Sequence, residues 1–460
     1  MQDPRRVDPA LRKKYDVRGP RYTSYPPATH FRPIPDEELF SRWTARSGLE
    51  DDPGLSLYLH IPFCRTRCAF CGCHSVVTPD RDTVERYLRA LVREMTIASE
   101  RIGRMRPVRQ VALGGGTPNS LSEHQTDLLL CSLERTWRVE AGAERSVEID
   151  PRTATPGKLD VFLGHGFNRF SLGVQDLAPD VLAVVRRGQD LMRVEEVVSH
   201  LRSRGCQSIN FDLIYGLPGQ DLSSAARTAE QVVRLRPSRI ALYSYAHVPW
   251  LQPNQKLLER IGLPEPDLKL SLFLVMLDLL QEAGYVSVGM DHFALPHDSL
   301  ARALESRSLR RNFMGYTTGR GTDLVAFGAS AISSVGASYS QDRKGIDAYL
   351  EGIEAGSLPV ERGFLLDRSD EIRRELIIDL FCNFSVDLAA LGARFGIDPA
   401  QLFAEDLERL KPLVDDGLVA ADPRAVTVSE TGRFFIRNVC MAFDRYLERD
   451  ASARMYSRTV

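Results

Sequence analysis

Apolar and polar positions alternate over residues 55–61, and this alternation predicts a β-strand with one apolar face. Leucines and an isoleucine occupy that face, and Ser56, Tyr58 and His60 occupy the other. Over residues 82–102 the apolar positions recur at helical spacing, opened by Asp82 with Glu85 three residues later. This strand-then-helix pattern recurs five more times, with strands expected near residues 109–116, 145–151, 169–176, 209–220 and 239–249.

Six strands that are each followed by a helix predict an α/β fold with a parallel sheet and right-handed crossovers. Most of these strands carry polar residues on one face, at Tyr58, Glu148, Gln175 and Asp212. A sheet covered by helices on both sides would bury such residues against apolar layers, whereas a barrel offers them a lumen. We therefore expect a partial (β/α)6 barrel of the TIM type, with these side chains converging inside it.

The two ends of the chain depart from this pattern. Residues 1–54 are rich in cations and prolines, which predicts an arm wrapped on the rest of the chain, with a short helix over 36–43. Residues 369–460 predict helices, a hairpin over 418–432 and a final helix over 433–450, an order typical of winged-helix-like domains. Because this segment holds twelve Lys and Arg against sixteen Asp and Glu, we expect it to cap the barrel mouth and not to bind DNA.

The composition is that of an ordinary globular protein, with 43% hydrophobic residues, 26% charged residues and a formal net charge of −2. There is no basic excess that would favour nucleic acid as a partner. No apolar run approaches the ~18 residues of a membrane span, and the first residues contain no apolar leader segment, so we expect a cytoplasmic protein. Eight cysteines in so long a chain argue against a disulfide framework, and we expect buried free thiols at Cys131, Cys206, Cys382 and Cys440.

The other four cysteines crowd into ten residues directly after the first strand, at Cys64, Cys68, Cys71 and Cys73. A tight loop of this spacing can direct three thiolates to one iron–sulfur cubane and leave its fourth iron free to chelate a small molecule. Zinc is the competing metal, with His74 available to complete a ligand set, although zinc prefers four ligands arranged as two separated pairs. The loop therefore favours an iron–sulfur cluster.

The stretch "CRTRCAFC" resembles the CxxxCxxC signature of radical S-adenosylmethionine (SAM) enzymes. A narrower resemblance is to the oxygen-independent coproporphyrinogen III oxidases of haem biosynthesis. It rests on "GPRYTSYP", "LYLHIPFCRTRCAFCGC", "LGGGTP", "VEIDPR", "FNRFSLGVQD", "NFDLIYGLPGQ", "VGMDHFA", "GTDLVAFGASAIS" and "FFIRNVCMAFDRYL", which span nearly the whole chain. The resemblance implies an arm (1–54), a radical SAM barrel (55–368) and a mainly helical, winged-helix-like C-terminal domain (369–460).

By this resemblance, Cys64, Cys68 and Cys71 bind a [4Fe-4S] cluster, and SAM occupies the open iron, where it is cleaved to a 5′-deoxyadenosyl radical. The residues implied around this SAM are Tyr58, Phe70, Gly115, Gly116, Thr117 and Glu148. The residues implied around a second SAM are Gln175, Arg187, Asp212, Ile214, Ala246 and Ile332. Two SAM molecules suit a substrate with two propionates to remove.

The resemblance also implies catalytic roles for Tyr58, Glu148, Cys73, Phe313 and Met314. Cys73 supports catalysis, since relatives that carry haem as chaperones generally lack this cysteine. Where the family has Asn-Phe-Gln-Gly-Tyr-Thr-Thr, this chain has methionine at position 314, and a thioether cannot donate a hydrogen bond as the amide of glutamine can.

The expected reaction is the oxidative decarboxylation of two propionates of coproporphyrinogen III, giving protoporphyrinogen IX. The resemblance implies a monomer that receives electrons from a protein such as flavodoxin or ferredoxin. Arg21 and Arg187 can complement the four carboxylates of the substrate. The residues leave two alternative functions open. One is a haem-binding chaperone of the same family without decarboxylase activity, and the other is a radical SAM methyltransferase or cyclopropanase.

Overall fold

The computed structural model describes residues 7–46, 52–78, 80–319, 321–447 and 456–459. At its centre lies a twelve-stranded sheet in the order β16-β15-β14-β13-β1-β4-β5-β6-β7-β8-β10-β9. Six neighbouring strands run parallel and coincide with the six predicted ones. They are β1 (Leu55–Ile61), β4 (Val108–Gly115), β5 (Val139–Ile149), β6 (Arg169–Gln175), β7 (Ser208–Tyr215) and β8 (Arg239–Ser244). The predicted partial (β/α)6 barrel is confirmed.

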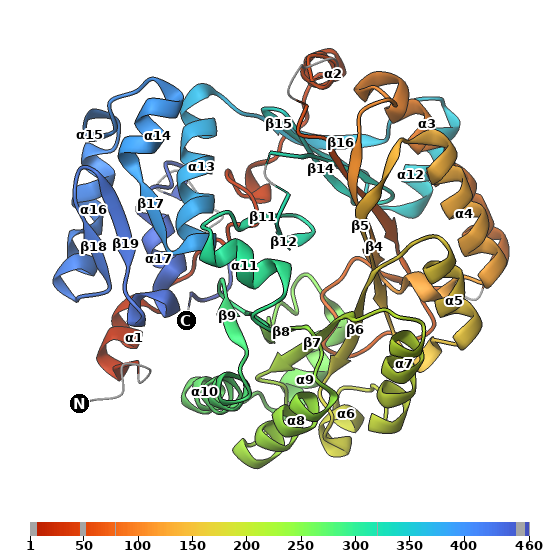
Figure 1. The fold of residues 1–460 in the computed structure, drawn as a ribbon, viewed down its shortest axis with the longest axis horizontal. Coiled ribbons are helices and arrows are strands. Elements are labelled where there is room, and N and C mark those ends of the chain that lie inside the picture. The colour runs from red at the N-terminus through yellow and green to blue at the C-terminus, as the bar shows by residue number, and fades with distance from the viewer. Residues whose placement is uncertain (1–6, 47–51, 79, 320, 448–455, 460) are drawn as a thin grey trace.

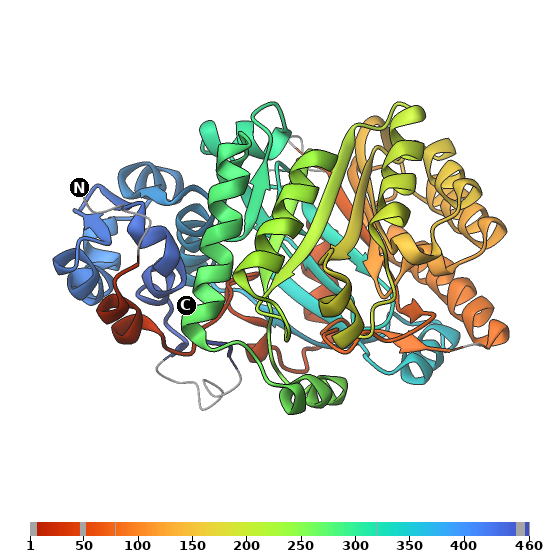
Figure 2. The same ribbon diagram turned by 90° about the horizontal axis from the view of Figure 1, so that it is seen from below.

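Helices cover the outer side of this curved sheet (Figures 1 and 2). They are α3 (Arg81–Ile102), α4 (Glu123–Thr136), α5 (Pro156–Gly164), α6 (Pro179–Val184), α7 (Leu191–Ser203), α8 (Leu222–Leu235) and α10 (Pro266–Glu282). Their apolar faces and the apolar faces of the strands form one large core, in which Leu57, Leu59 and Phe211 are fully buried. The predicted helix cap at Asp82 is wrong by two residues, because the carboxylate of Asp80 accepts the backbone N–H groups of Asp82 and Thr83.

The sheet continues beyond the barrel on both sides, which the sequence did not predict. Next to β1 lie the parallel strand β13 (Asp323–Phe327) and three antiparallel strands, β14 (Ile332–Val335), β15 (Ser338–Asp342) and β16 (Val360–Leu365). Next to β8 lie two short antiparallel strands, β10 (His292–Ala294) and β9 (Val286–Val288). The barrel is therefore open, because β16 and β9 are the two ends of the sheet and do not pair with each other.

Several shorter elements complete this part of the chain. They are β2 (Phe63–Cys64), β3 (Val76–Val77), η2 (Pro118–Ser120), η3 (Pro151–Thr153), η4 (Pro253–Gln255), α9 (Lys256–Ile261), α11 (Ser299–Glu305), β11 (Arg310–Asn312), β12 (Gly315–Thr317) and α12 (Ile346–Glu354). Strands β11 and β12 form a separate hairpin that lies between the barrel and the C-terminal helices (Figure 1).

The C-terminal part contains the predicted helices and the predicted hairpin. Its elements are α13 (Arg368–Asn383), β17 (Ser385–Asp387), α14 (Leu388–Phe395), α15 (Pro399–Leu402), α16 (Ala404–Asp415), β18 (Val419–Ala421), β19 (Ala425–Val428), η5 (Thr431–Phe435) and α17 (Ile436–Met441). Strands β17, β19 and β18 form a small antiparallel sheet. The single helix expected over 433–450 is wrong, because a 3-10 turn followed by a six-residue helix stands in its place; residues 448–450 lie outside the described residues.

The N-terminal arm runs along both parts of the molecule, as predicted. The expected short helix is α2 (Asp36–Thr44), whereas α1 (Pro9–Tyr15) and the turn η1 (Ala28–His30) were not predicted. Tyr15, Tyr22 and Tyr25 belong to a second core that also includes residues between Val288 and Tyr316 and the C-terminal helices. This core therefore draws on all three predicted segments.

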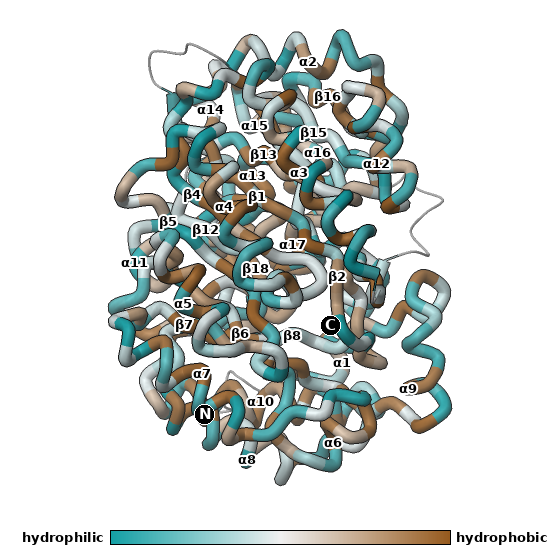
Figure 3. Tube along the Cα trace, turned by 90° about the vertical axis from the view of Figure 1, so that its right-hand side faces the viewer, coloured by the Kyte–Doolittle hydropathy of each residue, from teal (hydrophilic) through white to brown (hydrophobic). Residues whose placement is uncertain are grey.

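Apolar residues concentrate along the central strands, and hydrophilic residues lie mainly on outer helix faces and turns (Figure 3). Within the described ranges, no helix has the length and apolar character needed to cross a membrane.

Candidate active site

A cavity of about 740 Å³ occupies the barrel lumen. It extends from the cysteine loop, at the carboxyl ends of the parallel strands, to Gln110, Arg169 and Arg239 near their amino ends. The arm adds Arg21, and the β11–β12 hairpin adds residues 313–317. None of the lining residues in the described part of the chain comes from beyond Thr317, so the predicted C-terminal cap is wrong. The C-terminal helices instead support the hairpin from behind, where Arg310 pairs with Glu375 at 2.7 Å and Asp379 at 2.8 Å.

The cysteine loop lies between β2 and β3, which pair in parallel and close the loop. Cys64, Cys68, Cys71 and Cys73 all line the cavity, and all eight cysteines of the chain are free thiols. The thiol of Cys73 is hydrogen-bonded to that of Cys71, and this bond lowers the pKa of Cys71 and raises that of Cys73. Of the four other cysteines, Cys206, Cys382 and Cys440 are buried as predicted, whereas Cys131 is only half-buried.

Two arginines approach the thiol of Cys68. The Arg187 side chain, on the loop after α6, places Nη1 3.5 Å from Cys68 Sγ, and Arg152 places Nη2 3.7 Å from the same atom. Asp150 lies between the two guanidinium groups, 2.6 Å from Arg152 and 3.5 Å from Arg187. Burial is the largest single influence and acts to raise the pKa of Asp150, but the hydrogen bonds from Arg152 and the charges of Arg187 and Arg152 together outweigh it and lower that pKa. Arg187 is only 5% exposed, so it is a buried cation of the site.

The glycines that end β4 allow a close approach of backbone to the cavity. Gly115 has φ +113°, and a Cβ on Gly116 would lie 2.5 Å from the carbonyl oxygen of Pro62, so neither position accepts a side chain without strain. Thr117 follows, with Oγ1 3.4 Å from Cys64 Sγ. The sequence "GGGTP" therefore presents bare backbone next to the first cysteine.

Glu148 points from β5 into the lumen, as the alternation predicted. Its carboxylate accepts the backbone N–H of Gly115 at 3.1 Å. Burial, and after it the charge of Asp212, raises the pKa of Glu148 to about 7. A cation placed beside this carboxylate would favour its charged form by direct attraction.

Tyr58 and His60 lie next to each other on β1. The hydroxyl of Tyr58 is 3.2 Å from His60 Nδ1, and His60 Nε2 is 2.9 Å from the carbonyl oxygen of His74. Burial lowers the pKa of His60 to about 4, so the ring is neutral and its Nε2–H donates to that carbonyl. The side chain of His74 is not among the cavity-lining residues, which weakens the zinc alternative.

Most residues predicted around a second SAM line the same cavity. Gln175, Arg187, Asp212, Ile214 and Ala246 all contribute to its wall. Asp212 accepts two hydrogen bonds, from the Ser171 hydroxyl on the adjacent strand β6 at 2.7 Å and from the Asn210 amide on its own strand β7 at 2.9 Å. Ile332 is the exception. It lies on β14 in a separate apolar group with Phe31, Tyr339 and Leu366, outside the set of lining residues.

Phe313 and Met314 form the turn of the β11–β12 hairpin and face the cavity. The backbone N–H of Met314 donates to Asn312 Oδ1 at 2.8 Å, which holds the turn. The ring of Phe313 packs edge-on against Tyr339, with the ring centres 5.9 Å apart. Both residues therefore occupy fixed places in the cavity wall.

Comparisons with known proteins agree with this architecture. Residues 58–232 match the model of the radical SAM superfamily, and residues 366–435 match the HemN C-terminal domain. The chain is 41% identical over 453 residues to the oxygen-independent coproporphyrinogen III oxidase of Escherichia coli strain K12, covering 98% of both chains. It is 39% identical over 464 residues to the enzyme of the same name from Pseudomonas aeruginosa, covering all of both. The chain belongs to the oxygen-independent coproporphyrinogen III oxidase family.

A solved structure supports the same assignment. The Escherichia coli coproporphyrinogen III oxidase HemN, described as a radical SAM enzyme, matches with a TM-score of 0.90 and 39% identity, covering 96% of this chain and 99% of that one. A radical SAM oxidase of this family works with a [4Fe-4S] cluster and SAM. The residues present fit both, because three unpaired thiols of one loop open onto a cavity that also holds bare glycine backbone and a carboxylate.

Sequence reasoning missed several residues of this oxidase's site. Asp150 and Arg152 stand in the quoted "VEIDPR" stretch, so a signal was present, but nothing in the stretch indicated that they approach Cys68. Tyr243 and His292 line the lumen from β8 and β10. Asn254 and Gln255 contact the cysteine loop from the segment after β8 and belong to no recognisable motif.

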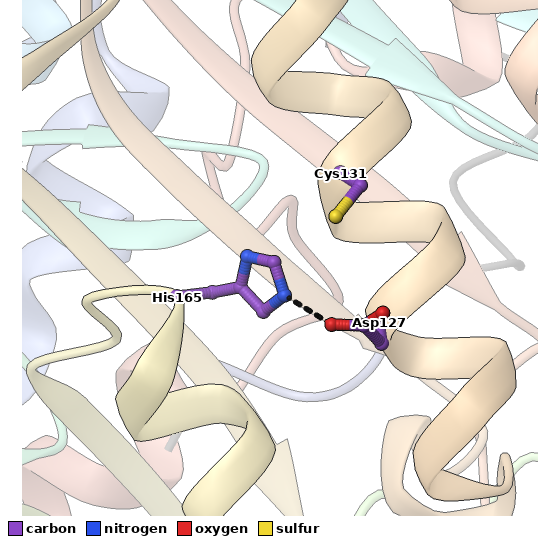
Figure 4. Close-up of side chains that lie close together, drawn as sticks. All are labelled: Asp127, Cys131 and His165. Atoms are coloured by element: carbon purple, nitrogen blue, oxygen red, sulfur yellow. Dashed lines mark hydrogen bonds and ion pairs between the residues drawn. The ribbon is translucent and has the colours of Figure 1, made fainter.

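A second group of potential metal-binding side chains lies outside the barrel, between α4 and α5 (Figure 4). The donor atoms of Asp127, Cys131 and His165 lie within 4.8 Å of one another. His165 Nε2 is 3.0 Å from Asp127, and His165 Nδ1 is 3.2 Å from Glu134. Because a carboxylate contacts each ring nitrogen, we interpret the group as a polar contact between two helices of the oxidase.

Proposed function

We infer that the protein is an oxygen-independent coproporphyrinogen III oxidase, which converts two propionates of coproporphyrinogen III to vinyl groups and forms protoporphyrinogen IX. Each propionate loses carbon dioxide, one hydrogen atom and one electron. The observation that carries the inference is the 41% identity across 98% of both chains, in a protein whose cysteine loop opens onto one large cavity. Similar relatives from Bradyrhizobium diazoefficiens and Pseudomonas aeruginosa also carry the oxidase name, so the chaperone alternative gains no support from them.

We propose that Cys64, Cys68 and Cys71 would hold a [4Fe-4S] cluster and that SAM would bind beside it in the same cavity. When bound, the cluster and SAM together would supply the carbon radical that abstracts hydrogen from the substrate. The first SAM is assigned to Tyr58, Phe70, Gly115, Gly116, Thr117 and Glu148, and a second SAM to Gln175, Arg187, Asp212, Ile214 and Ala246. The bare backbone at Gly115 and Gly116 permits close approach of the ligand, and Glu148 can accept its ammonium group.

Catalytic contact with the substrate is proposed for Cys73, Phe313 and Met314, which face the same cavity. The substrate carries four carboxylates, and Arg21 brings a cation to the cavity from the arm. Esters of the substrate should therefore bind more weakly than the acid. Equal affinity of ester and acid would show that attraction between the arginine and the carboxylates does not contribute to binding.

The proposal also covers the electron donor, the oligomeric state and the cellular location of the protein. We propose that a small electron-transfer protein such as flavodoxin or ferredoxin reduces the cluster, and that the chain works as a monomer. Eight free thiols suit the reducing conditions of the cytoplasm. Light scattering during gel filtration tests the monomer, and reduction by purified flavodoxin tests the donor.

The main experiment is an anaerobic incubation of cluster-reconstituted protein with SAM, a low-potential reductant and coproporphyrinogen III. Chromatography then follows 5′-deoxyadenosine and porphyrin products. Protoporphyrinogen formed together with 5′-deoxyadenosine supports the proposal, and 5′-deoxyadenosine without decarboxylation contradicts it. Cys68→Ser should abolish both products, whereas the matched change Cys131→Ser, on the outer helix α4, should leave both unchanged.

A further inference from the structure

A histidine of the cavity wall, His292, has no part in the SAM places proposed above. It begins β10, the strand that extends the sheet beyond β8, and it lines the cavity. In the sheet it pairs with Ala241 of β8, which pairs in turn with Asp212 of β7. Ala241 comes three residues before Ser244, the end of β8. At ~3.3 Å per residue, His292 therefore lies about 10 Å from the edge of the barrel that carries the cysteine loop.

The ring of His292 is held in place on one side by Asp291. The Oδ1 atom of Asp291 lies 2.7 Å from His292 Nδ1, and both side chains are largely buried. The rings of Tyr243 and Tyr316 stand edge-on to the imidazole, with ring centres 5.8 Å and 5.0 Å away. Because Asp291 takes the Nδ1 side of the ring, Nε2 is the atom left for a ligand, and among the residues that the structure describes it has no hydrogen-bond partner.

The charges around this histidine favour an anion. Burial acts to raise the pKa of Asp291, but the hydrogen bond and the charge of His292 act against it. The charges of Arg311 and Arg21 add to this effect, and the pKa of Asp291 is lowered overall. Within the described ranges, Nε and Nη1 of Arg311 are buried without a hydrogen-bond partner. Two arginines thus stand against one aspartate here, and an imidazole that gains a proton at Nε2 adds a further positive charge.

A second hydrogen-bond donor stands beside the histidine. Tyr243 lines the cavity from β8, and burial raises the pKa of its hydroxyl well above the ordinary value, so the group keeps its proton. In the described part of the chain this hydroxyl has no hydrogen-bond partner. A carboxylate has two oxygen atoms, so it can accept hydrogen bonds from an imidazolium and from a hydroxyl at the same time.

We propose that His292 and Tyr243 bind a carboxylate of the substrate that the reaction leaves in place. The inference rests on the proposed function, in which the substrate carries four carboxylates and loses two of them. Hydrogen abstraction belongs where SAM is cleaved, beside the cysteine loop, whereas this site lies about 10 Å further along the lumen. The carboxylate bound here is therefore one of the two that remain in the product.

Two substitutions test the site. His292→Phe keeps a flat ring between the two tyrosines and removes both ring nitrogens. Tyr243→Phe removes only a hydroxyl that bonds no described residue, so this variant should fold as the wild type does. His124→Phe makes the histidine change at an exposed position near the start of α4 and serves as the control. Circular dichroism checks each variant, and Tyr243→Phe carries the test alone if His292→Phe does not fold.

Binding is measured on anaerobically reconstituted full-length protein, by fluorescence, with two oxidised porphyrins that the enzyme cannot decarboxylate. Coproporphyrin III carries all four carboxylates, and protoporphyrin IX carries only the two that the reaction spares. A site for a retained carboxylate predicts the same loss of affinity for both porphyrins. We expect this loss to be about tenfold in His292→Phe and about threefold in Tyr243→Phe, with His124→Phe equal to the wild type.

Three results would overturn the proposal. They are wild-type affinity in a folded variant of either residue, a loss confined to coproporphyrin III, which would assign the site to a carboxylate that is removed, and failure of the wild type to bind either porphyrin. Failure of the proposed function has a different outcome. If the wild type forms no protoporphyrinogen while porphyrin binding still depends on His292, the oxidase assignment fails and the carboxylate site stands.

Discussion

A buried pair of carboxyl groups, Glu94 on α3 and Asp342 on β15, should make the stability of the protein depend on pH. Both are buried, at 2% and 6% exposure, and they are hydrogen-bonded to each other. Glu94 Oε2 also accepts the backbone N–H of Gly328 at 2.9 Å and the hydroxyl of Tyr349 at 2.6 Å. Burial raises the pKa of Glu94 to about 7, and burial together with the charge of Glu94 raises that of Asp342 well above its ordinary value.

The sign of the effect follows from where the proton is held. The folded protein keeps the Glu94 proton up to a pH of about 7, whereas the unfolded chain releases it near its ordinary pKa of 4.5. The stabilisation is therefore fully present below about pH 4.5 and is lost as the pH rises through 7. At 1.36 kcal/mol for each pH unit, this loss is about 3 kcal/mol, which corresponds to about 5 °C in the midpoint for a unit of about 300 residues.

The perturbation that tests this is Glu94→Gln, which has nearly the same shape and cannot ionise. Thermal unfolding of wild type and variant is followed anaerobically at intervals from pH 5 to pH 8. The midpoint of the variant, relative to the wild type, should rise by about 5 °C across this range. Glu100→Gln, at an exposed acid of the same helix, should show no such trend. A difference between variant and wild type that stays constant with pH would refute the reasoning.

Three further changes test the cavity. Gly116→Ala places a Cβ 2.5 Å from the carbonyl oxygen of Pro62 and should weaken SAM binding at least about tenfold while the iron content stays unchanged. Equilibrium dialysis measures the SAM affinity. The control variant is Gly142→Ala, where the added Cβ meets open space. Arg187→Met removes a buried cation beside Cys68 and should lower the iron retained after reconstitution, and wild-type iron content would contradict a role for this charge. Met314→Gln restores a hydrogen-bonding amide and should equal or exceed wild-type turnover, so a clear loss of turnover would argue against a substrate contact at this turn.

The sequence was a good guide to the barrel, because the pattern there follows a strong physical constraint. Each parallel strand must bury one face under helices, and its other face lines a polar lumen, so alternation marked all six strands and directed Glu148 inward. The strands β9, β10 and β13–β16 are only three to six residues long and depend on pairing with distant partners, so no local pattern identified them. The position of the C-terminal domain was mispredicted for a similar reason, since docking depends on side chains such as Arg310 that pair across the interface.

The site residues also fall into two groups, those marked by local sequence features and those set by contacts between distant segments. The cysteine spacing and the glycines of "GGGTP" are local features, and the structure brings them together at one end of the lumen. Ile332 was carried over by resemblance alone, and it lies apart from the lining residues because β14 belongs to the extension of the sheet. Asn254 and Gln255 could not be predicted, because an amide in a polar loop is common and only the folded chain shows what it contacts.

The cysteine motif is short, but the groups that support it come from four other segments. Thr117 follows β4, Arg152 follows β5, Arg187 follows α6, and Gln255 follows β8. Three of these segments follow the carboxyl end of a barrel strand, and Arg187 lies in the connection between β6 and α7, so the barrel places at one edge what the sequence spreads over about 140 residues. The pairing of β2 with β3 closes the loop, but most of the backbone carbonyls between Cys68 and Cys71 are bonded by the segment after β8. This dependence explains why a loop that carries four cysteines within ten residues of the sequence still relies on distant barrel segments to hold it.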